Sequence, residues 1–554
     1  MSAFVRAPAR APLAFALVLA VASSPALARA APVTFELTES LSVDWHWVLD
    51  DAQLVDEADR EDVVDLRNRL NLRLRTGAWT FGLRLDAAWF PSPPSAQYES
   101  DLRPEEMFIT YKDKSWTLTA GDDYLTIGRG LALSLRKFDE IGFATNLRGA
   151  HARFRTDGFE MRLGAGFTNV VNVDSVEEKL VPDPNDLVFL ARIESDALGP
   201  LTLGAHVVDI ERRHSDVRLA LTDPLFGDGA DDLIQGRRFE RTLITGLTAE
   251  LAFDGVDINA EAGYLTNDET RATLAGDTPS GEPGVALYLG ATGTFGRWTA
   301  LLEGKHYDHW RVDSSLHPET ADAQGVTQFF PYVTPPSLER IDQRVVNNTD
   351  VSGVHLRLDH AFPPSAKGNK LILFASGAFF VDAPAQGEWT LHTYGGLELT
   401  TASGDRLVLQ TGYRREEAPD AGTDGIIRLG MWHLDLDWSK TIAKAVDLQM
   451  HWTHEFRDKN IGADSLAEGY YEGTFYLSVN LPPAWSITGQ LEYLTNSATV
   501  QSTFPGAFLQ WKPDSASFVR LFVGRSKGGL KCSGGVCRIF PDFEGVKLET
   551  TLRF

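Results

Sequence analysis

The sequence is poor in cysteine, in basic residues and in long apolar stretches. Two cysteines are too few for a structural zinc site made of cysteine ligands. The longest apolar run beyond the N-terminus, about Lys370–Ala383, falls short of the roughly 20 residues that a membrane-spanning helix needs. With 52 Lys and Arg against 76 Asp and Glu, the formal charge is −24. That charge argues against a nucleic-acid partner, because phosphate binding requires a basic surface.

Glycine and aromatic residues are abundant instead. The 554 residues include 48 Gly, 31 Phe and 13 Trp, and the mean hydropathy is −0.17. This balance argues against an intrinsically disordered chain and against a bundle of membrane helices. It fits a transmembrane β-barrel, in which each strand mixes apolar and polar residues.

The N-terminus has the parts of a secretory signal peptide. Two arginines precede an apolar core over residues 12–24, and small residues up to Ala30 offer cleavage sites. We therefore expect residues 1–30 to be the signal peptide and residues 31–554 to form an outer-membrane β-barrel. The alternative, a retained helical anchor, is disfavoured by the shortness of the core.

Beyond the signal peptide, hydrophobicity alternates with a period of two. In residues 33–47, side chains such as Leu37 and Trp45 share one face, whereas Glu36 and Asp44 share the other. This period predicts a β-strand with one apolar and one polar face. The same pattern recurs to the C-terminus without a break that would separate domains.

Short and long connections alternate along the chain, as do the periplasmic turns and external loops of outer-membrane barrels. We therefore predict one closed antiparallel barrel of about 24 strands, within a range of about 22 to 26, with no N-terminal plug and with both termini on the periplasmic side. Short turns are expected near residues 113–115, 156–158, 196–200, 254–255, 296–297, 363–369, 402–406, 439–444, 482–484 and 513–515, and long loops near 49–62, 91–104, 121–146, 209–236, 308–348 and 525–545.

Aromatic residues flank the short turns. Amphipathic rings at this height form the interfacial girdle of a membrane barrel, whereas a soluble propeller, solenoid or sandwich has no reason to place them there. The residues that open strands are Trp79, Trp116, Phe159, Trp298 and Trp485, and those that close strands are Phe154, Phe253, Phe295, Phe362, Trp438 and Trp511.

The last predicted strand ends like an outer-membrane assembly signal. Val546, Leu548 and Leu552 share one face, and the chain ends on Phe554. We expect this strand to be read by the barrel-assembly machinery and to face outer-membrane lipid. The alternative is an ordinary last strand.

Two segments resemble known outer-membrane proteins. Residues 117–154 and the stretch GGLKCSGGVCRIFPDFEG at 528–545 resemble an uncharacterised family of Gram-negative outer-membrane β-barrels of bacteroidete and myxobacterial type. The first segment is also similar to alginate-export and carbohydrate porins, in which a glycine-arginine strand end precedes an FDGARL-like strand, here LRGAHARF. The resemblance implies a barrel fold and an outer-membrane location.

One long connection, residues 121–146, carries charges of both signs and several glycines. Folded into the lumen, it would form a pore constriction in which acids face bases. The alternative is a solvated external loop whose charges neutralise one another. The candidate constriction residues are Asp122, Asp123, Arg129, Arg136, Lys137, Asp139 and Glu140.

Five arginines share the polar face of the second and third predicted strands. They would form a basic stripe in the lumen, suited to anionic solutes. The alternative, which we favour, is that they pair with lumenal acids, as Arg69 would with Asp86. The five are Arg67, Arg69, Arg73, Arg75 and Arg84.

A histidine and aspartate cluster is a weak candidate for a metal site. His433, Asp435 and Asp437 alternate on one strand, and simple hairpin register places His433 opposite His451 on the next. Imidazoles and carboxylates so arranged bind divalent cations. We favour the plainer interpretation, an ordinary polar lumen, and expect no bound metal and no cofactor.

Cys532 and Cys537 flank a flexible Ser-Gly-Gly-Val stretch, and the exported compartment permits a disulfide between them at an external loop tip. The GRSKGG segment at 524–529 is not a nucleophile elbow, and no nucleotide-binding fingerprint occurs. We therefore expect no enzymatic activity.

The features together predict a porin-like outer-membrane channel for a hydrophilic solute, with its lumen narrowed by inward-folded loops. The alternative is a barrel without a transport role, acting as a surface scaffold or as an assembly partner for a periplasmic or lipoprotein subunit. The sequence leaves the solute, the direction of transport and the oligomeric state open.

Overall fold

A computed structural model describes most of the chain beyond its N-terminus. Residues 1–31, which include the predicted signal peptide, lie outside the described residues. In the described part, no helix is long and apolar enough to cross a membrane. The described residues are 32–46, 63–89, 100–138, 142–174, 179–180, 183–212, 237–271, 278–279, 283–310, 312, 332–336, 350–382, 387–419, 426–443, 446–461, 469–495, 503–533, 536–540 and 542–554.

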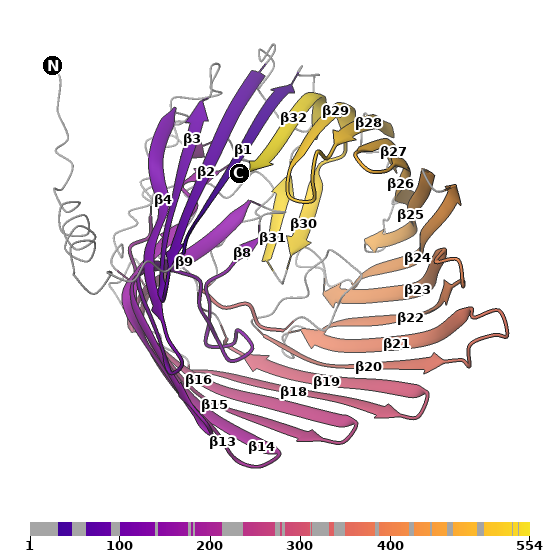
Figure 1. Cartoon of the computed structure of the whole chain (residues 1–554). Coiled ribbons are helices and arrows are strands. Elements are labelled where there is room, and N and C mark those ends of the chain that lie inside the picture. The colour runs from indigo at the N-terminus through magenta and orange to yellow at the C-terminus, as the bar shows by residue number, and fades with distance from the viewer. Residues whose placement is uncertain are drawn as a thin grey trace, which may run out of the picture.

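The described strands form one closed antiparallel barrel (Figure 1). Of the 26 strands in its sheet, β8 and β17 are two-residue additions, which leaves 24 in the wall and confirms the predicted number. The wall strands are β1 Val33–His46, β2 Val63–Thr76, β3 Trp79–Trp89, β4 Asp101–Lys112, β5 Trp116–Asp123, β9 Phe143–Thr156, β10 Phe159–Val170, β13 Leu187–Leu198, β14 Leu201–Glu211, β15 Arg237–Phe253, β16 Val256–Arg271, β18 Gly284–Phe295, β19 Trp298–Asp308, β20 Val351–Ala361, β21 Lys370–Asp382, β22 Glu388–Thr400, β23 Arg406–Pro419, β24 Ile426–Ala443, β25 Val446–Ile461, β26 Tyr470–Leu481, β27 Trp485–Leu494, β28 Thr503–Trp511, β29 Phe518–Ser526 and β32 Phe543–Arg553.

Eight short strands lie in the connections between wall strands. Figure 1 shows β8 and the β30–β31 hairpin inside the ring of wall strands. The short strands are β6 Thr126–Ile127, β7 Leu133–Ser134, β8 Lys137–Phe138, β11 Val173–Asp174, β12 Lys179–Leu180, β17 Thr278–Pro279, β30 Gly529–Ser533 and β31 Val536–Phe540.

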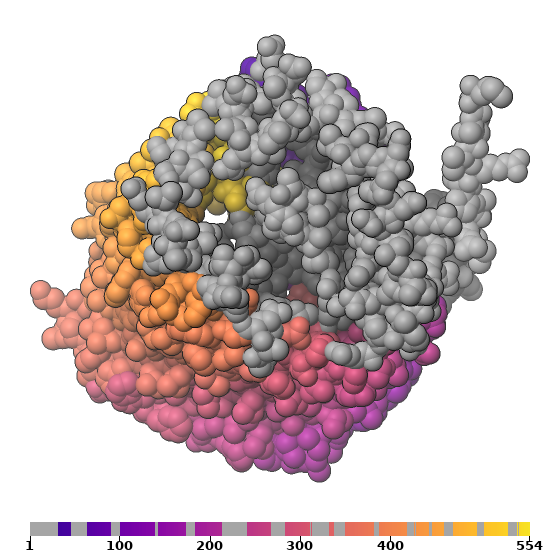
Figure 2. All heavy atoms as spheres, turned by 180° about the vertical axis from the view of Figure 1, so that it is seen from behind, coloured from indigo at the N-terminus to yellow at the C-terminus, as the bar shows by residue number. Residues whose placement is uncertain are grey.

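Alternation along each strand separates an outer from an inner face. In β14, Leu203 and Val207 are exposed on the outside, whereas Val208 and Ile210 are fully buried on the inside. Since side chains of a strand point alternately to its two faces, the period seen in the sequence becomes an apolar outer surface around a largely polar lumen. Figure 2 shows the wall curving around the left and lower sides of the molecule.

The short connections and both ends of the described chain gather at one end of the barrel. Leu37 and Phe554 exchange two backbone hydrogen bonds, of 3.2 and 2.8 Å, beside the first turn of the wall. Aromatic pairs follow the same rim: Trp116 lies 4.6 Å from Phe154 between ring centroids. Val546 stands opposite Trp45 on the outer face of the closing seam. This arrangement confirms the predicted even number of strands, which places both ends of the described chain at the same end of the barrel.

The seam between β1 and β32 closes the ring. Nine residues of each strand pair in antiparallel register, from Thr38–Arg553 to His46–Gly545. On the inner side, the buried Asp44 carboxylate accepts a hydrogen bond of 2.5 Å from Arg67 on β2 and lies 3.2 Å from Lys547 on β32. One carboxylate therefore links three strands across the closure.

The predicted register of one hairpin is wrong. The turn expected at residues 439–444 falls later, because β24 continues to Ala443 and β25 begins at Val446 with a bulge before it. His433 consequently stands opposite Glu455, and Asp437 stands opposite His451. The turn position determines hairpin register, so moving the turn separated His433 from His451.

Replacing Asp44 with alanine should weaken the barrel. The substitution leaves Arg67 and Lys547 without their shared carboxylate, and we expect a loss of about 1–3 kcal/mol in the free energy of unfolding. Urea unfolding in detergent, followed by tryptophan fluorescence, measures this loss. As a control, Glu36→Ala removes a more exposed carboxylate, 3.6 Å from Arg553, and should cost less than about 1 kcal/mol. Equal losses for both variants would contradict the central role of Asp44.

Candidate functional site

The connection between β5 and β9 lies inside the barrel. Leu131, Ala132, Leu133 and Leu135 are fully or almost fully buried. They belong to one apolar cluster with inward-facing residues of the wall. The wall members of this cluster include Val188, Leu190, Val208, Ile210, Ile244, Leu265 and Ala286. A wet lumen would leave these wall side chains exposed, so the connection and the wall cover one another's apolar surface.

A second, distant stretch of chain packs on the first. The indole N–H of Trp310 donates to the carbonyl of Leu131 at 3.2 Å. The backbone N–H of Ser134 donates to the backbone carbonyl of Tyr332 at 2.7 Å, and the backbone N–H of Thr334 donates to the backbone carbonyl of Gly130 at 3.0 Å. We call the described residues 124–138, 310, 312 and 332–336 the inner layer. These hydrogen bonds join the two stretches, so the inner layer is a packed body and not a loose loop.

Tyr332 anchors the inner layer to the wall. Its hydroxyl donates to the Asp186 carboxylate at 2.7 Å and lies 2.9 Å from the Thr168 hydroxyl. Burial, with Asp186 close by, raises the pKa of Tyr332 well above its usual value. The phenol therefore keeps its proton and continues to donate at any physiological pH.

A wall carboxylate holds the turn of the inner layer. Glu261 on β16 accepts a 2.6 Å hydrogen bond from the backbone N–H of Arg129. Gly128 precedes it with φ of +61°, and a Cβ at that position would lie 2.1 Å from the Glu261 carboxylate oxygen. Glycine at position 128 therefore permits both the left-handed turn and the close approach to Glu261.

A polar cavity of about 570 Å³ separates the inner layer from the wall. It is lined by three arginines, four glutamates and a tyrosine, together with small side chains. Arg129 lies over the ring of Tyr288, 5.8 Å from its centroid, and Arg136 donates to Thr126 at 3.1 Å. The charged and aromatic lining residues are Arg129, Arg136, Arg192, Glu194, Glu250, Glu261, Glu303 and Tyr288. This charge-lined cavity is the candidate functional site.

The arginines that line the cavity differ in their partners. Within the described residues, neither Arg129 nor Arg136 forms an ion pair with a carboxylate, whereas Arg192 pairs with Glu194. Two guanidinium groups thus flank the cavity opposite a wall that carries carboxylates. Guanidinium groups recognise carboxylates and other oxyanions through paired N–H donors, and the wall acids suit cationic groups.

Two of the predicted constriction acids, Asp122 and Asp123, lie outside the cavity. Asp122 is buried and bonds to Arg148 at 2.9 Å and to the backbone N–H of Met107 at 2.6 Å. Asp123 bonds to His151 at 3.0 Å. Lys137 lies on β8 opposite Ala144, and residues 139 and 140, the predicted Asp139 and Glu140, lie outside the described residues.

The acids that face Arg129 and Arg136 come from the wall. Glu194, Glu250 and Glu303 stand on β13, β15 and β19, far from the inner layer in sequence. Sequence reasoning missed them, although each lies at an inward-facing position of its strand. The alternation along a strand predicts that such a side chain faces the lumen, but it does not predict which loop the side chain will contact.

Most of the basic stripe is neutralised by neighbouring acids. Arg84 is buried and bonds to Asp86 at 2.7 Å and to Glu106 at 2.7 Å. Arg69 lies 3.5 Å from Asp86, and Arg67 pairs with Asp44. Arg73 and Arg75 are exposed toward the short-turn end, and in the described part of the chain neither forms an ion pair.

The cysteine hairpin crosses toward the inner layer. Cys532 and Cys537 stand directly opposite each other in β30–β31. Their side chains lie outside the described residues, so the disulfide stays a prediction. Phe540 at the end of β31 packs on Phe143 of β9, although five wall strands separate β32 from β9 along the ring. Phe138 of the inner layer packs on the same ring, so the hairpin reaches across the barrel interior to the side that carries the inner layer.

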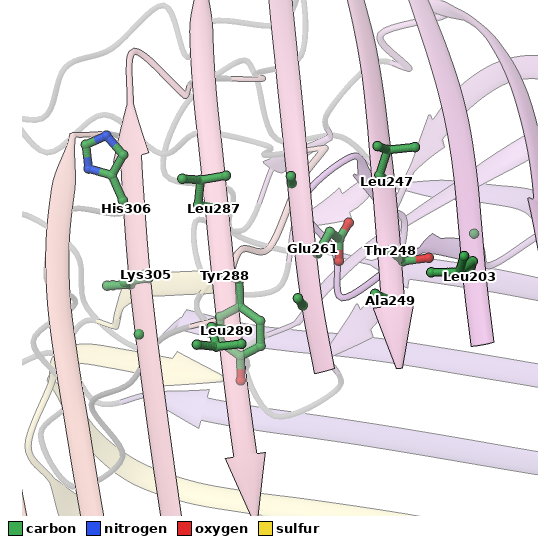
Figure 3. A pocket seen from close by; sticks show the side chains of 14 residues that line it. Leu203, Leu247, Thr248, Ala249, Glu261, Leu287, Tyr288, Leu289, Lys305 and His306 are labelled. Carbon is green, nitrogen blue, oxygen red and sulfur yellow. The ribbon is translucent and has the colours of Figure 1, made fainter. Parts of the chain in front are cut away.

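A second hollow, of about 600 Å³, lies on the outer face of the wall (Figure 3). Leu203, Leu247, Leu287 and Leu289 surround it and are all exposed. Small residues, including Gly204, Ala249 and Ala260, leave the space between them. Its apolar lining and outward position suit contact with lipid tails.

Comparison with known proteins gives one family match. Residues 11–173 and 445–554, slightly less than half of the chain, match the model of a family of unknown function (DUF6029). In the ring these two stretches are neighbours, because β32 pairs with β1. The matched sector contains residues 124–138 of the inner layer and the β30–β31 hairpin. No match was found among curated proteins.

Among solved structures, the chain is similar to outer-membrane proteins of Pseudomonas aeruginosa. The siderophore receptor PirA gives a TM-score of 0.45 at 8% identity, covering 95% of this chain and 81% of that chain. OccK2 (OpdF), solved in complex with glucuronate, gives 0.35 at 11% identity, covering 81% and 98%. OpdL gives 0.36 at 13% identity, again covering 81% and 98%. These likenesses concern the fold and not the solute.

Replacing Trp310 with alanine should loosen the inner layer without opening the wall. The indole is fully buried, so its loss leaves a cavity that costs roughly 3–5 kcal/mol of local stability. Hydrogen exchange at the amides of Ser134 and Leu135 should then accelerate, while amides of β14–β16 keep their protection. Trp432→Ala, at an outward and exposed position, serves as the control and should change neither set. Unaltered exchange at Ser134 in the Trp310 variant would contradict the packing described above.

Proposed function

We propose that the protein is a porin-like outer-membrane channel that passes a hydrophilic solute. The exported chain would lose residues 1–30 and insert as a barrel of 24 strands. Support comes from the closed ring with its apolar outer face and from the aromatic residues that flank its short turns. A closed barrel satisfies its backbone groups without an edge, which a membrane requires of a β-structure.

One observation carries the proposal: an apolar inner layer is packed on one side of a polar lumen. The apolar cluster that contains the layer extends over inward-facing residues of wall strands between β9 and β21, the last of them Phe380 on β21. It leaves the inner faces of β22–β29 outside its apolar cluster among the described residues. A barrel of this size is wide enough for an aqueous passage, and a layer on one wall narrows such a passage without filling it.

The cavity charges give the proposed channel a means of selection. A solute that enters the cavity between the inner layer and the wall would meet Arg129 and Arg136 on one side and Glu194, Glu250 and Glu303 on the other. Opposed charges across a narrow, partly dehydrated passage create a transverse field that orients polar solutes and rejects apolar ones. The solute is thereby limited to hydrophilic molecules, and the two arginines favour those with anionic groups.

Deleting residues 129–139 should raise single-channel conductance in planar bilayers. The deletion removes the centre of the inner layer, including the buried leucines at 131, 133 and 135, and widens the passage. The matched control removes Ala366–Gly368 from the exposed turn between β20 and β21, far from the lumen, and should conduct like the parent. If the deletion variant conducts like the parent, the inner layer does not limit the pore. If neither the parent nor the deletion variant conducts, the surface-scaffold alternative is favoured.

Neutralising the inner layer should shift ion selectivity toward cations. The triple variant Arg129→Gln, Arg136→Gln, Lys137→Gln removes three positive charges and leaves the wall glutamates in place. The reversal potential across a KCl gradient should therefore move in the cation-selective direction. Arg241→Gln is the control, because Arg241 pairs with Asp209 on the outer face and should leave the reversal potential unchanged. If the reversal potential of the control shifts by the same amount, the effect comes from the overall charge of the protein and not from the inner layer.

A further inference from the structure

Two histidines from alternate strands meet on the inner wall. His392 on β22 and His433 on β24 approach with their Nε2 atoms 3.0 Å apart, and both side chains are buried. Their ring planes are inclined at 71°, with centroids 5.1 Å apart. The cluster predicted from the sequence pairs His433 with His451 and does not include His392.

A glycine on the strand between them makes this approach possible. Gly412 on β23 stands opposite His433 on one side and Tyr394 on the other. A Cβ at position 412 would lie 2.4 Å from Nε2 of His433. Any other residue at 412 would push the His433 ring away from His392, so the meeting of the two rings depends on this glycine.

Asp435 fixes the orientation and the tautomer of His433. Its carboxylate lies 2.8 Å from Nδ1 of His433, so Nδ1 carries the proton and donates. The Nε2 lone pair of His433 therefore points toward His392. Gln410 donates to the same carboxylate at 3.2 Å and holds it in place. A carboxylate behind an imidazole in this way is the arrangement that orients histidine ligands of metal ions.

We propose that His392 and His433 bind a divalent transition-metal ion, Zn²⁺ as the probe, between their Nε2 atoms. Zinc binds imidazole nitrogen at about 2.0–2.1 Å, so two nitrogens on one ion lie about 2.9–3.4 Å apart for bond angles between 90° and 110°. The observed 3.0 Å falls within this range. In the bound form each ring would coordinate the ion through its Nε2 lone pair and carry its proton on Nδ1, and water would complete the coordination.

The surroundings are compatible with an added cation. Arg414 stands opposite His392 in register, but its guanidinium lies 2.5 Å from the Glu416 carboxylate. Asp435 contributes a negative charge directly behind His433. Tyr394 lies beside His392, with ring centroids 5.3 Å apart, and covers the pair from one side.

Other lumenal histidines lack this arrangement. His355 uses both ring nitrogens, with Glu303 at 2.9 Å and Ser376 at 2.8 Å. His451 bonds to Asp437 at 2.6 Å and is exposed. In the part of the chain that the structure describes, the only hydrogen-bonded contact between two imidazoles is that of His392 with His433. This site is independent of the transport proposal, since it requires only the folded barrel.

Calorimetric titration of the full-length barrel in detergent with ZnCl₂ tests the proposal. We expect saturable binding by the parent. His392→Gln and His433→Gln, which keep a polar side chain of similar reach, should each weaken binding at least about tenfold, and Asp435→Asn should weaken it by about 10–100-fold. Circular dichroism confirms that each variant retains the β-barrel signal before it is titrated.

Two further variants separate this site from other zinc ligands. His451→Gln, a histidine paired with an aspartate on the neighbouring strand, should bind Zn²⁺ like the parent. Gly412→Ala removes no ligand but separates the rings, and should weaken binding as the histidine variants do. The proposal is overturned if the parent binds no Zn²⁺ at millimolar concentration, if the His392 and His433 variants bind like the parent, or if His451→Gln loses as much affinity as they do.

Discussion

The closure of β1 on β32 is the constraint on which the rest of the structure depends. A membrane offers no hydrogen bonds to an open strand edge, so the first and last strands must pair. The closed ring has 24 wall strands, and a barrel of that size has a lumen too wide to be filled by wall side chains alone. At this seam the buried carboxylate of Asp44 lies between Arg67 and Lys547, which stand on the two strands that flank β1.

The inner layer follows from this wide lumen. Wall strands from β9 to β21 carry apolar residues on their inner face, such as Val208 and Ile244, which an open aqueous pore would expose. Leucines at 131, 133 and 135 cover them, and Trp310 and Tyr332 hold the cover in place through hydrogen bonds to backbone and wall. The polar cavity between Arg129 and the wall glutamates is what remains uncovered. Transport selectivity, as proposed, is therefore a product of how the lumen is packed.

Glycine has two distinct roles in the interior. Gly128 allows the left-handed turn that brings the backbone of Arg129 to Glu261, and Gly412 clears the space in which His392 meets His433. In both cases the missing side chain brings together groups from different strands. The proposed metal site and the proposed constriction thus depend on glycines, which contribute no side-chain group to either site.

The sequence by itself determined the wall, since a period of two, alternating connection lengths and aromatic residues at the turns are local features. It also placed Arg129 and Arg136 in the segment that lines the cavity. Only the tertiary structure decided their partners: Asp122 turned to Arg148, and Glu194, Glu250 and Glu303 came from strands remote in sequence. The register of β24 and β25 was likewise beyond sequence reasoning, because a turn displaced by a few residues exchanges His451 for Glu455 opposite His433. Period predicts which face a side chain occupies, whereas closure and loop packing decide which side chains meet.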